Sequence, residues 1–201
     1  TLLLVILPAL IIVGMMGLTR HTSALSGSTF QPGRIIDDGL FYRSGDMSVT
    51  EIQNFLNAKV PVCDTAGTKP YAGTTRAAYS ISRGYPPPFI CLKDYTASVS
   101  AMAADTYCTG GISAGLKTSA QIIREVSVAC NISSKVLLVL LQKEQILVTD
   151  DWPWPNQTNA ATGYGCPDTS SCDPSFVGFF NQVYYAARQY QRYDKQPQLF
   201  N

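Results

Sequence analysis

Six cysteines constrain the fold of this chain more than any other feature of its sequence. All of them lie beyond residue 60: Cys63, Cys91, Cys108, Cys130, Cys166 and Cys172. An even number of cysteines in an exported chain is typical of a disulfide framework. Pairing sequence neighbours across short loops favours the bridges Cys63–Cys91, Cys108–Cys130 and Cys166–Cys172.

The first residues predict export. Residues 1–18 read TLLLVILPALIIVGMMGL and carry no charge. The length of this uncharged run is at the lower limit for a membrane-spanning helix and slightly greater than that of a signal-peptide core. We expect residues 1–20 to be a signal peptide or membrane anchor that projects from the domain, and residues 21–29 to be a tether. Either alternative places the remaining chain outside the cytoplasm, secreted or anchored at the cell surface through residues 1–18.

Charge and histidine content exclude several classes of function. The formal net charge is +1, with no basic stripe, so nucleic acid is not an expected partner. The only histidine, His21, lies in the tether, which excludes a Ser-His-Asp triad, a Cys-His pair and a His-ligated zinc. No Cys-x-x-Cys motif occurs either, so we expect no metal and no cofactor. Any chemistry must depend on carboxylates, tyrosines or lysines.

Residues 30–201 suit a single α+β domain that is mainly helical, with long disulfide-braced loops. A capping box at Ser48–Glu51 predicts a helix that carries apolar residues to Val60, and a second capping box at Thr118–Gln121 predicts a helix that ends at Asn131. The stretches 61–92 and 150–173 are broken by Gly and Pro, which predicts a long loop in the first and a loop with a short hairpin in the second.

Two further helices complete the expected fold. Ser133 is the predicted N-cap of a helix from Ser134 to about Leu147, and its middle is apolar on every side, so we expect it to run through the core. Asp173 and Pro174 are expected to open the last helix as N-cap and first residue, and this helix is expected to reach about Tyr193.

Glu144 is the candidate catalytic residue. It follows the most hydrophobic stretch of the domain, where partial burial favours the protonated carboxyl that a general acid requires in glycoside cleavage. The alternative is that Lys143–Gln145 only marks the point where the helix reaches solvent. For an acid we expect no lysine or arginine salt bridge to Glu144, and Lys143 should point about 100° away on the helix. The carboxyl should lie partly buried at the floor of a groove, facing residues 163–165 or 180–181.

The same region resembles the lysozyme-like superfamily, above all the lytic transglycosylases. The resemblance is carried by residues 131–138, Asn-Ile-Ser-Ser-Lys-Val-Leu-Leu, together with Lys143-Glu144-Gln145. It implies a lysozyme-like portion over about residues 115–193, Glu144 as the acid, and a glycine-rich segment lining a cleft. Residues 161–165 and 178–182 are the two candidates for that segment. Gln145 departs from the family pattern, which has Ser there, and neither glycine segment matches in full.

A second resemblance covers nearly everything after Ser28. It is to a family of exported proteins of actinobacteria and related cell-wall-bearing bacteria, and it indicates kinship without an activity. The motifs that carry it are Phe30-x-Pro32-Gly33-x-Ile35-Ile36, Cys91-Leu92-Lys93-Asp94-Tyr95, Gly163-Tyr164-Gly165-Cys166-Pro167-Asp168 and Gly178-Phe179-Phe180-Asn181-Gln182-Val183-Tyr184.

Several residues are candidates for substrate binding. Trp152 and Trp154 between prolines are candidates for a sugar-stacking platform or for loop packing, and Tyr164, Asn181 and Gln182 for orienting a glycan. The candidates for a second carboxylate are Asp150, Asp151, Asp168 and Asp173, of which Asp168 suits a turn and Asp173 an N-cap. A lytic transglycosylase needs no second carboxylate, whereas a hydrolase needs one.

Two functions from different classes follow. The first is an exported cell-wall glycosidase that cleaves peptidoglycan glycan strands with Glu144 as general acid, of lytic transglycosylase or glucosaminidase type. The alternative is a non-catalytic module that binds the cell wall or another surface partner and keeps a lysozyme-like fold.

Overall fold

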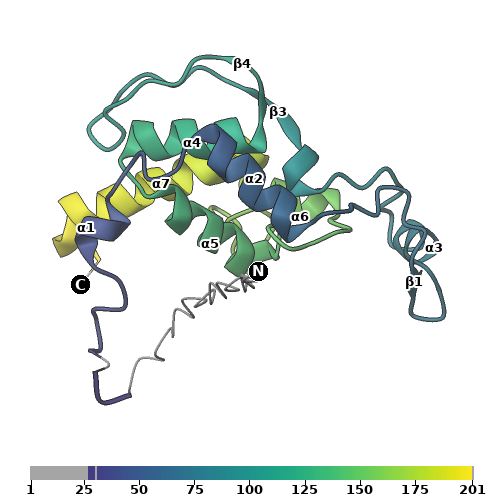
Figure 1. Ribbon diagram of the computed structural model, residues 1–201. Helices are drawn as coiled ribbons and strands as arrows, with labels where there is room; N and C mark the ends of the chain where they lie inside the picture. Colours follow the sequence, from purple (N-terminus) through teal and green to yellow (C-terminus); the bar gives the residue numbers. More distant parts are fainter. Residues whose placement is uncertain (1–26, 30, 201) are drawn as a thin grey trace, which may run out of the picture. The chain divides into compact units, whose positions relative to one another are not determined.

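The computed structural model describes residues 27–29 and 31–200, and all elements from α1 onward belong to one compact unit, Ile36–Asn201 (Figure 1). The unit combines helices with two small sheets and is mainly helical, as predicted. Its helices are α1 (Asp38–Phe41), α2 (Val49–Lys59), α3 (Arg76–Ile81), α4 (Ser119–Cys130), α5 (Ser134–Gln145), α6 (Pro155–Asn159) and α7 (Phe179–Lys195). Its strands are β1 (Pro70–Tyr71), β2 (Thr74–Thr75), β3 (Thr96–Val99) and β4 (Gly115–Thr118).

Short 3-10 helices occur at Gly27–Thr29, Leu92–Asp94, Pro174–Phe176 and Pro197–Leu199.

Helices α2 and α4 begin at the capping boxes that the sequence predicts. The Ser48 hydroxyl accepts a hydrogen bond from the Glu51 amide, and the Glu51 carboxylate accepts one from the Ser48 amide. Thr118 and Gln121 make the same reciprocal pair at the start of α4. Asn131 ends α4 in the left-handed conformation, with φ of 50°. These local predictions are confirmed because each depends only on residues within one helical turn.

Helix α4 forms the centre of the core. It packs against α7, α2 and α5, and its residues Ile122, Ile123 and Val126 are at most 1 % exposed. Facing side chains come from each neighbouring helix: Ile52 and Leu56 from α2, Leu137 and Leu141 from α5, and Phe179, Val183 and Ala187 from α7. Burying each large aliphatic side chain contributes about 1.5–3 kcal/mol, so this helical core dominates the stability of the unit.

The expectation that α5 runs through the core is wrong for one of its sides. Leu137, Leu138 and Leu141 are buried, but Val139 is 65 % exposed. Among the helices and strands that the structure describes, α4 makes the most extensive contact with α5, and α5 buries one face although its middle is apolar all round. The helix also ends at Gln145 rather than Leu147, because Ile146 adopts the left-handed conformation, with φ of 61°.

The last helix begins later than predicted. Asp173 does cap a turn, accepting a hydrogen bond from the Ser175 amide, but that turn is the separate 3-10 helix Pro174–Phe176. Val177 is extended and Gly178 has φ of 102°, which breaks the run before α7 starts at Phe179. The predicted hairpin within 150–173 is also absent from the structure, and the short helix α6 lies there instead.

Residues 61–92 are not the long loop that the sequence suggests. They contain the antiparallel pair β1–β2, with Pro70 opposite Thr75, followed directly by α3. Thr75 caps α3 by accepting a hydrogen bond from the Ala78 amide. In Figure 1 this hairpin and α3 lie apart from the helices of the core, and the Cys63–Cys91 bridge closes the segment at its base.

The three predicted disulfides are confirmed: Cys63–Cys91, Cys108–Cys130 and Cys166–Cys172. The second joins the end of α4 to the chain between β3 and β4, which pair antiparallel with Thr96 opposite Thr118. Since disulfides persist in oxidising compartments, the three bridges indicate an extracytoplasmic environment.

The predicted signal or anchor segment, residues 1–20, and most of the tether lie outside the described residues. Among the helices that the structure does describe, none has the length and apolar character needed to cross a membrane.

Candidate functional site

Glu144 is the penultimate residue of α5, and both ends of that helix are fixed by hydrogen bonds. At the start, the Ser133 hydroxyl donates to Asp46, and the Ser134 amide donates to the same carboxylate, at 2.7 and 2.8 Å. Burial alone would raise the pKa of Asp46, but these hydrogen bonds outweigh it and leave the pKa lowered. At the other end, Gln157 of α6 donates to the Gln145 carbonyl at 3.0 Å.

The Glu144 carboxyl faces the glycine segment, as expected. A Cβ atom added at Gly163 would lie 3.6 Å from Glu144 Oε2, which is van der Waals contact. The backbone of the loop therefore passes close to the carboxyl. The Glu144 side chain is 32 % exposed. It therefore has one oxygen directed at the loop and remains accessible to solvent.

The prediction that no lysine pairs with Glu144 is wrong. Lys143 Nζ lies 2.9 Å from Glu144 Oε1. Neighbouring helix residues point about 100° apart, but the flexible Lys143 side chain, 76 % exposed, bends back to reach the carboxyl. An exposed pair of this kind contributes little to stability, about 0–1 kcal/mol, so it can be exchanged for another partner at small cost.

Gln182 holds the glycine segment in place and does not face solvent. This side chain of α7 is fully buried, and its carbonyl oxygen accepts hydrogen bonds from the Thr162 and Tyr164 amides, each at 3.1 Å. Its amide nitrogen donates to the carbonyls of Tyr164 and Phe176, each at 2.8 Å. The residue thus positions the loop opposite Glu144, a different role from the direct substrate contact that the sequence suggested.

The loop itself requires glycine. Gly163 and Gly165 have φ of 70° and 66°, which L side chains adopt only with strain. A Cβ atom at Gly165 would also lie 2.5 Å from a ring atom of Phe176. Gly163 is therefore required by its backbone conformation, and Gly165 by both its conformation and the close approach of Phe176.

Aromatic side chains border the loop. Tyr164 stacks on Tyr185 of α7, with ring centroids 5.8 Å apart, and meets Phe176 edge to face at 4.9 Å. Asn181, another predicted binding residue, donates its amide to the Val177 carbonyl at 3.0 Å and helps to shape the start of α7.

Tyr190 is a neighbour of Glu144 that sequence reasoning missed. Burial raises its pKa, and the negative charge of Glu144 raises it further. Tyr190 occurs on the buried face of a predicted amphipathic helix, so its sequence pattern signals only packing. What brings it near Glu144 is the arrangement of α5 and α7 in the fold.

The candidate second carboxylates are scattered. Asp150 accepts hydrogen bonds from the Trp152 amide and from Gln157, at 2.8 and 2.9 Å. Because Gln157 also bonds the Gln145 carbonyl, Asp150 is the one of the four with a hydrogen-bonded connection to the end of α5. Asp151 forms ion pairs with Lys69 and Arg76.

The other two have local surroundings. Asp173 caps a turn, and Asp168 is exposed in the small loop between Cys166 and Cys172.

The two tryptophans belong to a different group of aromatic residues. Trp152 and Trp154 contact each other, with centroids 5.5 Å apart, and both contact rings from the segment that holds β1, β2 and α3. The structure therefore gathers the predicted site residues into two sets, one around Glu144 and one around the tryptophans.

No three metal-ligating side chains lie together within the described part of the chain. Comparison of the chain with models of protein families, with curated proteins and with solved structures found no match.

Proposed function

We propose that this protein is an extracytoplasmic glycosidase that cleaves the glycan strands of peptidoglycan, with Glu144 as general acid. The observation that supports this most directly is the position of the carboxyl at the end of α5, facing the Gly163–Gly165 loop, which Gln182 holds rigid. A proton donor in glycoside cleavage must be fixed within hydrogen-bonding reach of the leaving oxygen. The end of α5, fixed by the hydrogen bond from Gln157 and lying opposite a braced loop, provides that position.

The ion pair with Lys143 sets a condition on this mechanism. The Lys143 ammonium occupies one oxygen of the Glu144 carboxyl, whereas a general acid needs its carboxyl free to reach the leaving oxygen of the glycan. Lys143 therefore has to leave Glu144 when a glycan binds. Its high exposure and flexible side chain make this exchange easy.

The surroundings of Glu144 are compatible with a lytic transglycosylase. In that reaction the hydroxyl of the substrate closes onto the anomeric carbon, so no second carboxylate is needed. A hydrolase would need one to activate water or to act as nucleophile, and Asp150 is then the candidate because of its connection to α5 through Gln157.

The test is wall clearing by the purified protein in a gel that contains peptidoglycan. Glu144→Gln keeps the shape of the side chain and removes the transferable proton. An acid contributes about 10²–10⁴-fold to the rate, so clearing should fall below detection. Asp194→Asn, a change at an exposed carboxylate of α7, is the matched control and should leave clearing unchanged. Full clearing by Glu144→Gln would exclude Glu144 as the acid.

A second candidate function is a non-catalytic module that binds the cell wall. The Lys143–Glu144 pair favours it, because the ammonium occupies the carboxyl that would have to contact the leaving oxygen of the glycan. In that case the wild-type protein binds insoluble peptidoglycan without releasing soluble fragments, and Glu144→Gln behaves as the wild type does.

A further inference from the structure

Five rings in mutual contact form a continuous group that we call the aromatic surface. Tyr71 is exposed, and the other four are partly buried: Tyr79, Tyr85, Trp152 and Trp154. Tyr71 contacts both Tyr79 and Trp152, with ring centroids 4.8 and 5.1 Å apart. Tyr85 stacks on Trp154 at 4.8 Å. Buried Phe89 meets Trp152 edge to face from the inner side, at 5.8 Å.

The rings of the aromatic surface have polar tips without partners. Among the described residues, the hydroxyls of Tyr71, Tyr79 and Tyr85 make no hydrogen bond, and Tyr71 is 44 % exposed. A buried tyrosine normally finds a partner for its hydroxyl, and partly exposed Tyr and Trp are typical of binding surfaces. These three hydroxyls can therefore donate to and accept from a ligand that lies against the rings.

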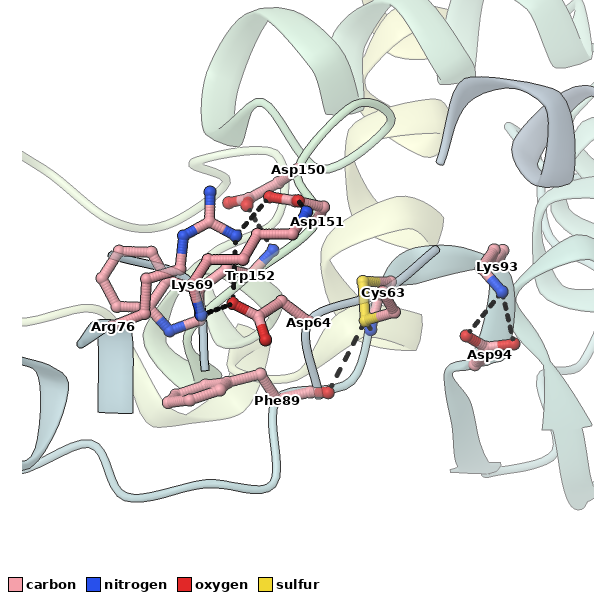
Figure 2. Close-up of a disulfide and its surroundings, with 11 residues drawn as sticks. Cys63, Asp64, Lys69, Arg76, Phe89, Lys93, Asp94, Asp150, Asp151 and Trp152 are labelled. Atoms are coloured by element: carbon pink, nitrogen blue, oxygen red, sulfur yellow. Dashed lines mark hydrogen bonds and ion pairs between the residues drawn. A yellow bond between two sulfur atoms is a disulfide. The ribbon is translucent and has the colours of Figure 1, made fainter. Parts of the chain in front are cut away.

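A rigid base supports the aromatic surface (Figure 2). The Cys63–Cys91 bridge closes the segment, and next to it the buried Asp64 carboxylate accepts hydrogen bonds from the amides of Thr68 and Lys69, at 2.8 and 3.1 Å.

Arg76 completes this base. It binds Asp151 at 2.8 Å and Asp64 at 3.4 Å, and its guanidinium lies 5.2 Å from the centroid of Trp152. These contacts fix the rings before any ligand arrives, which lowers the entropy lost on binding.

Unpaired positive charge borders the rings. The Arg83 guanidinium lies 5.1 Å from the Tyr79 centroid, and Arg83 has no carboxylate partner among the described residues. An open groove adjoins the ion pairs and is lined by Lys59, Val62, Lys69 and Asp151. Lys69 pairs with Asp151, but Lys59 has no carboxylate partner in the described chain. Two cations therefore remain available to an acidic ligand.

We infer that the aromatic surface, with Lys59 and Arg83, is a binding site for an acidic glycan, separate from the Glu144 site and independent of the proposed activity. A pyranose presents an apolar face surrounded by hydroxyls, which matches flat rings with polar tips. Carboxylate or phosphate groups on the glycan would bind Lys59 and Arg83. The polar tips favour a sugar over a lipid, whose chains offer nothing to the hydroxyls.

The test is co-sedimentation of the protein with three insoluble glycans. Peptidoglycan that carries teichoic acid supplies phosphate and carboxylate, the same peptidoglycan stripped of teichoic acid supplies carboxylate only, and chitin is the neutral reference. We expect tighter binding to the peptidoglycan that carries teichoic acid than to chitin, and we expect salt to weaken it. Loss of binding on stripping identifies phosphate as the acidic group, and retention identifies carboxylate. Equal binding to chitin, or binding to lipid vesicles instead, overturns the inference.

Variants assign the binding to the aromatic surface. Tyr71→Ala should weaken it about fivefold or more, and Tyr71→Phe, which keeps the ring and the packing, should weaken it less. Tyr193→Ala is the matched control, because Tyr193 is also 44 % exposed but lies at the end of α7 against Phe200. Full binding by Tyr71→Ala, with its fold verified by circular dichroism, contradicts the inference.

Charge variants and Glu144→Gln show whether the glycan binds at the aromatic surface or at Glu144. Arg83→Ala should weaken binding and reduce its salt dependence, whereas Lys135→Ala, at an exposed lysine of α5, should not. Glu144→Gln should bind as the wild type does, even if it no longer clears cell walls. Loss of glycan binding in Glu144→Gln would show that the glycan binds at Glu144 and overturn a separate site.

Discussion

The amide of Gln182 offers a direct test of how the loop opposite Glu144 is held. It accepts hydrogen bonds from two backbone amides and donates to two backbone carbonyls, and the residue is 0 % exposed. In Gln182→Glu, an oxygen replaces the donor that faces the carbonyls of Tyr164 and Phe176, each 2.8 Å away. A buried polar group left without a partner costs about 1–3 kcal/mol, so the free energy of unfolding should fall by about 3–5 kcal/mol.

The loss in Gln182→Glu should depend on pH in a defined direction. Burial among carbonyls raises the pKa of the introduced carboxyl in the folded state above its unfolded value of about 4.3. A group with a raised folded pKa binds more protons when folded, so the penalty is complete at pH 7 and shrinks as pH falls through the folded pKa. Gln182→Leu carries no such group, so its loss should not change with pH.

Urea denaturation at several pH values measures these differences, with Gln191→Leu as the control. Gln191 is a buried glutamine of the same helix, but its amide donates one hydrogen bond, to the Asn131 carbonyl at 3.3 Å. Its replacement should cost about 1 kcal/mol. If Gln182→Glu loses no more stability than Gln191→Leu at pH 7, the Gln182 amide does not hold the loop.

Three further perturbations have expected outcomes. Replacing Cys63 and Cys91 by serine should lower the free energy of unfolding by about 2–5 kcal/mol, measured against the oxidised wild type. Gly165→Ala should cost about 1–3 kcal/mol, because φ is 66° and the new methyl group meets Phe176; an unchanged melting temperature would contradict this. Burial would raise the pKa of Asp64, but hydrogen bonds from Lys69 and Thr68 leave it lowered, so its contribution to stability should be present above about pH 4 and be lost as pH falls further. Asp64→Asn should remove that part of the acid sensitivity in denaturation curves.

Sequence patterns predict the elements whose signals are local. The capping boxes of α2 and α4 and the N-cap of α5 each involve residues within one turn, and they are found where the sequence places them. The last helix shows the limit of this reasoning. Asp173 and Pro174 are a valid start signal, but the turn they open ends at Phe176, and Gly178 interrupts the chain before α7.

The surroundings of Glu144 could be predicted only in part. Proximity to the glycine segment follows from the family resemblance, but the Lys143 pair depends on the rotamer of one flexible side chain. No sequence pattern indicated that Gln182 is buried. A polar residue on the apolar face of a helix can equally be exposed to solvent or belong to a binding site.

The aromatic surface shows why contacts between residues far apart in the chain could not be predicted from the sequence. Tyr71 and Tyr79 belong to a segment that its glycines and prolines assign to a loop, and nothing in the sequence links them to Trp152. Arg76 lies against the Trp152 ring and between two carboxylates from distant parts of the chain, Asp64 and Asp151.

Gln157 connects the two sites. Its side-chain amide donates to the Gln145 carbonyl and to Asp150, and its side-chain oxygen accepts from the Trp154 amide at 2.6 Å. One residue of the short helix α6 thus holds the backbone of both Gln145, next to Glu144, and Trp154, whose ring belongs to the aromatic surface. These hydrogen bonds join the backbone at the end of α5 to the backbone at Trp154, just before α6. The two proposed sites therefore share one structural support but no ligand-binding residue, so each can be tested on its own.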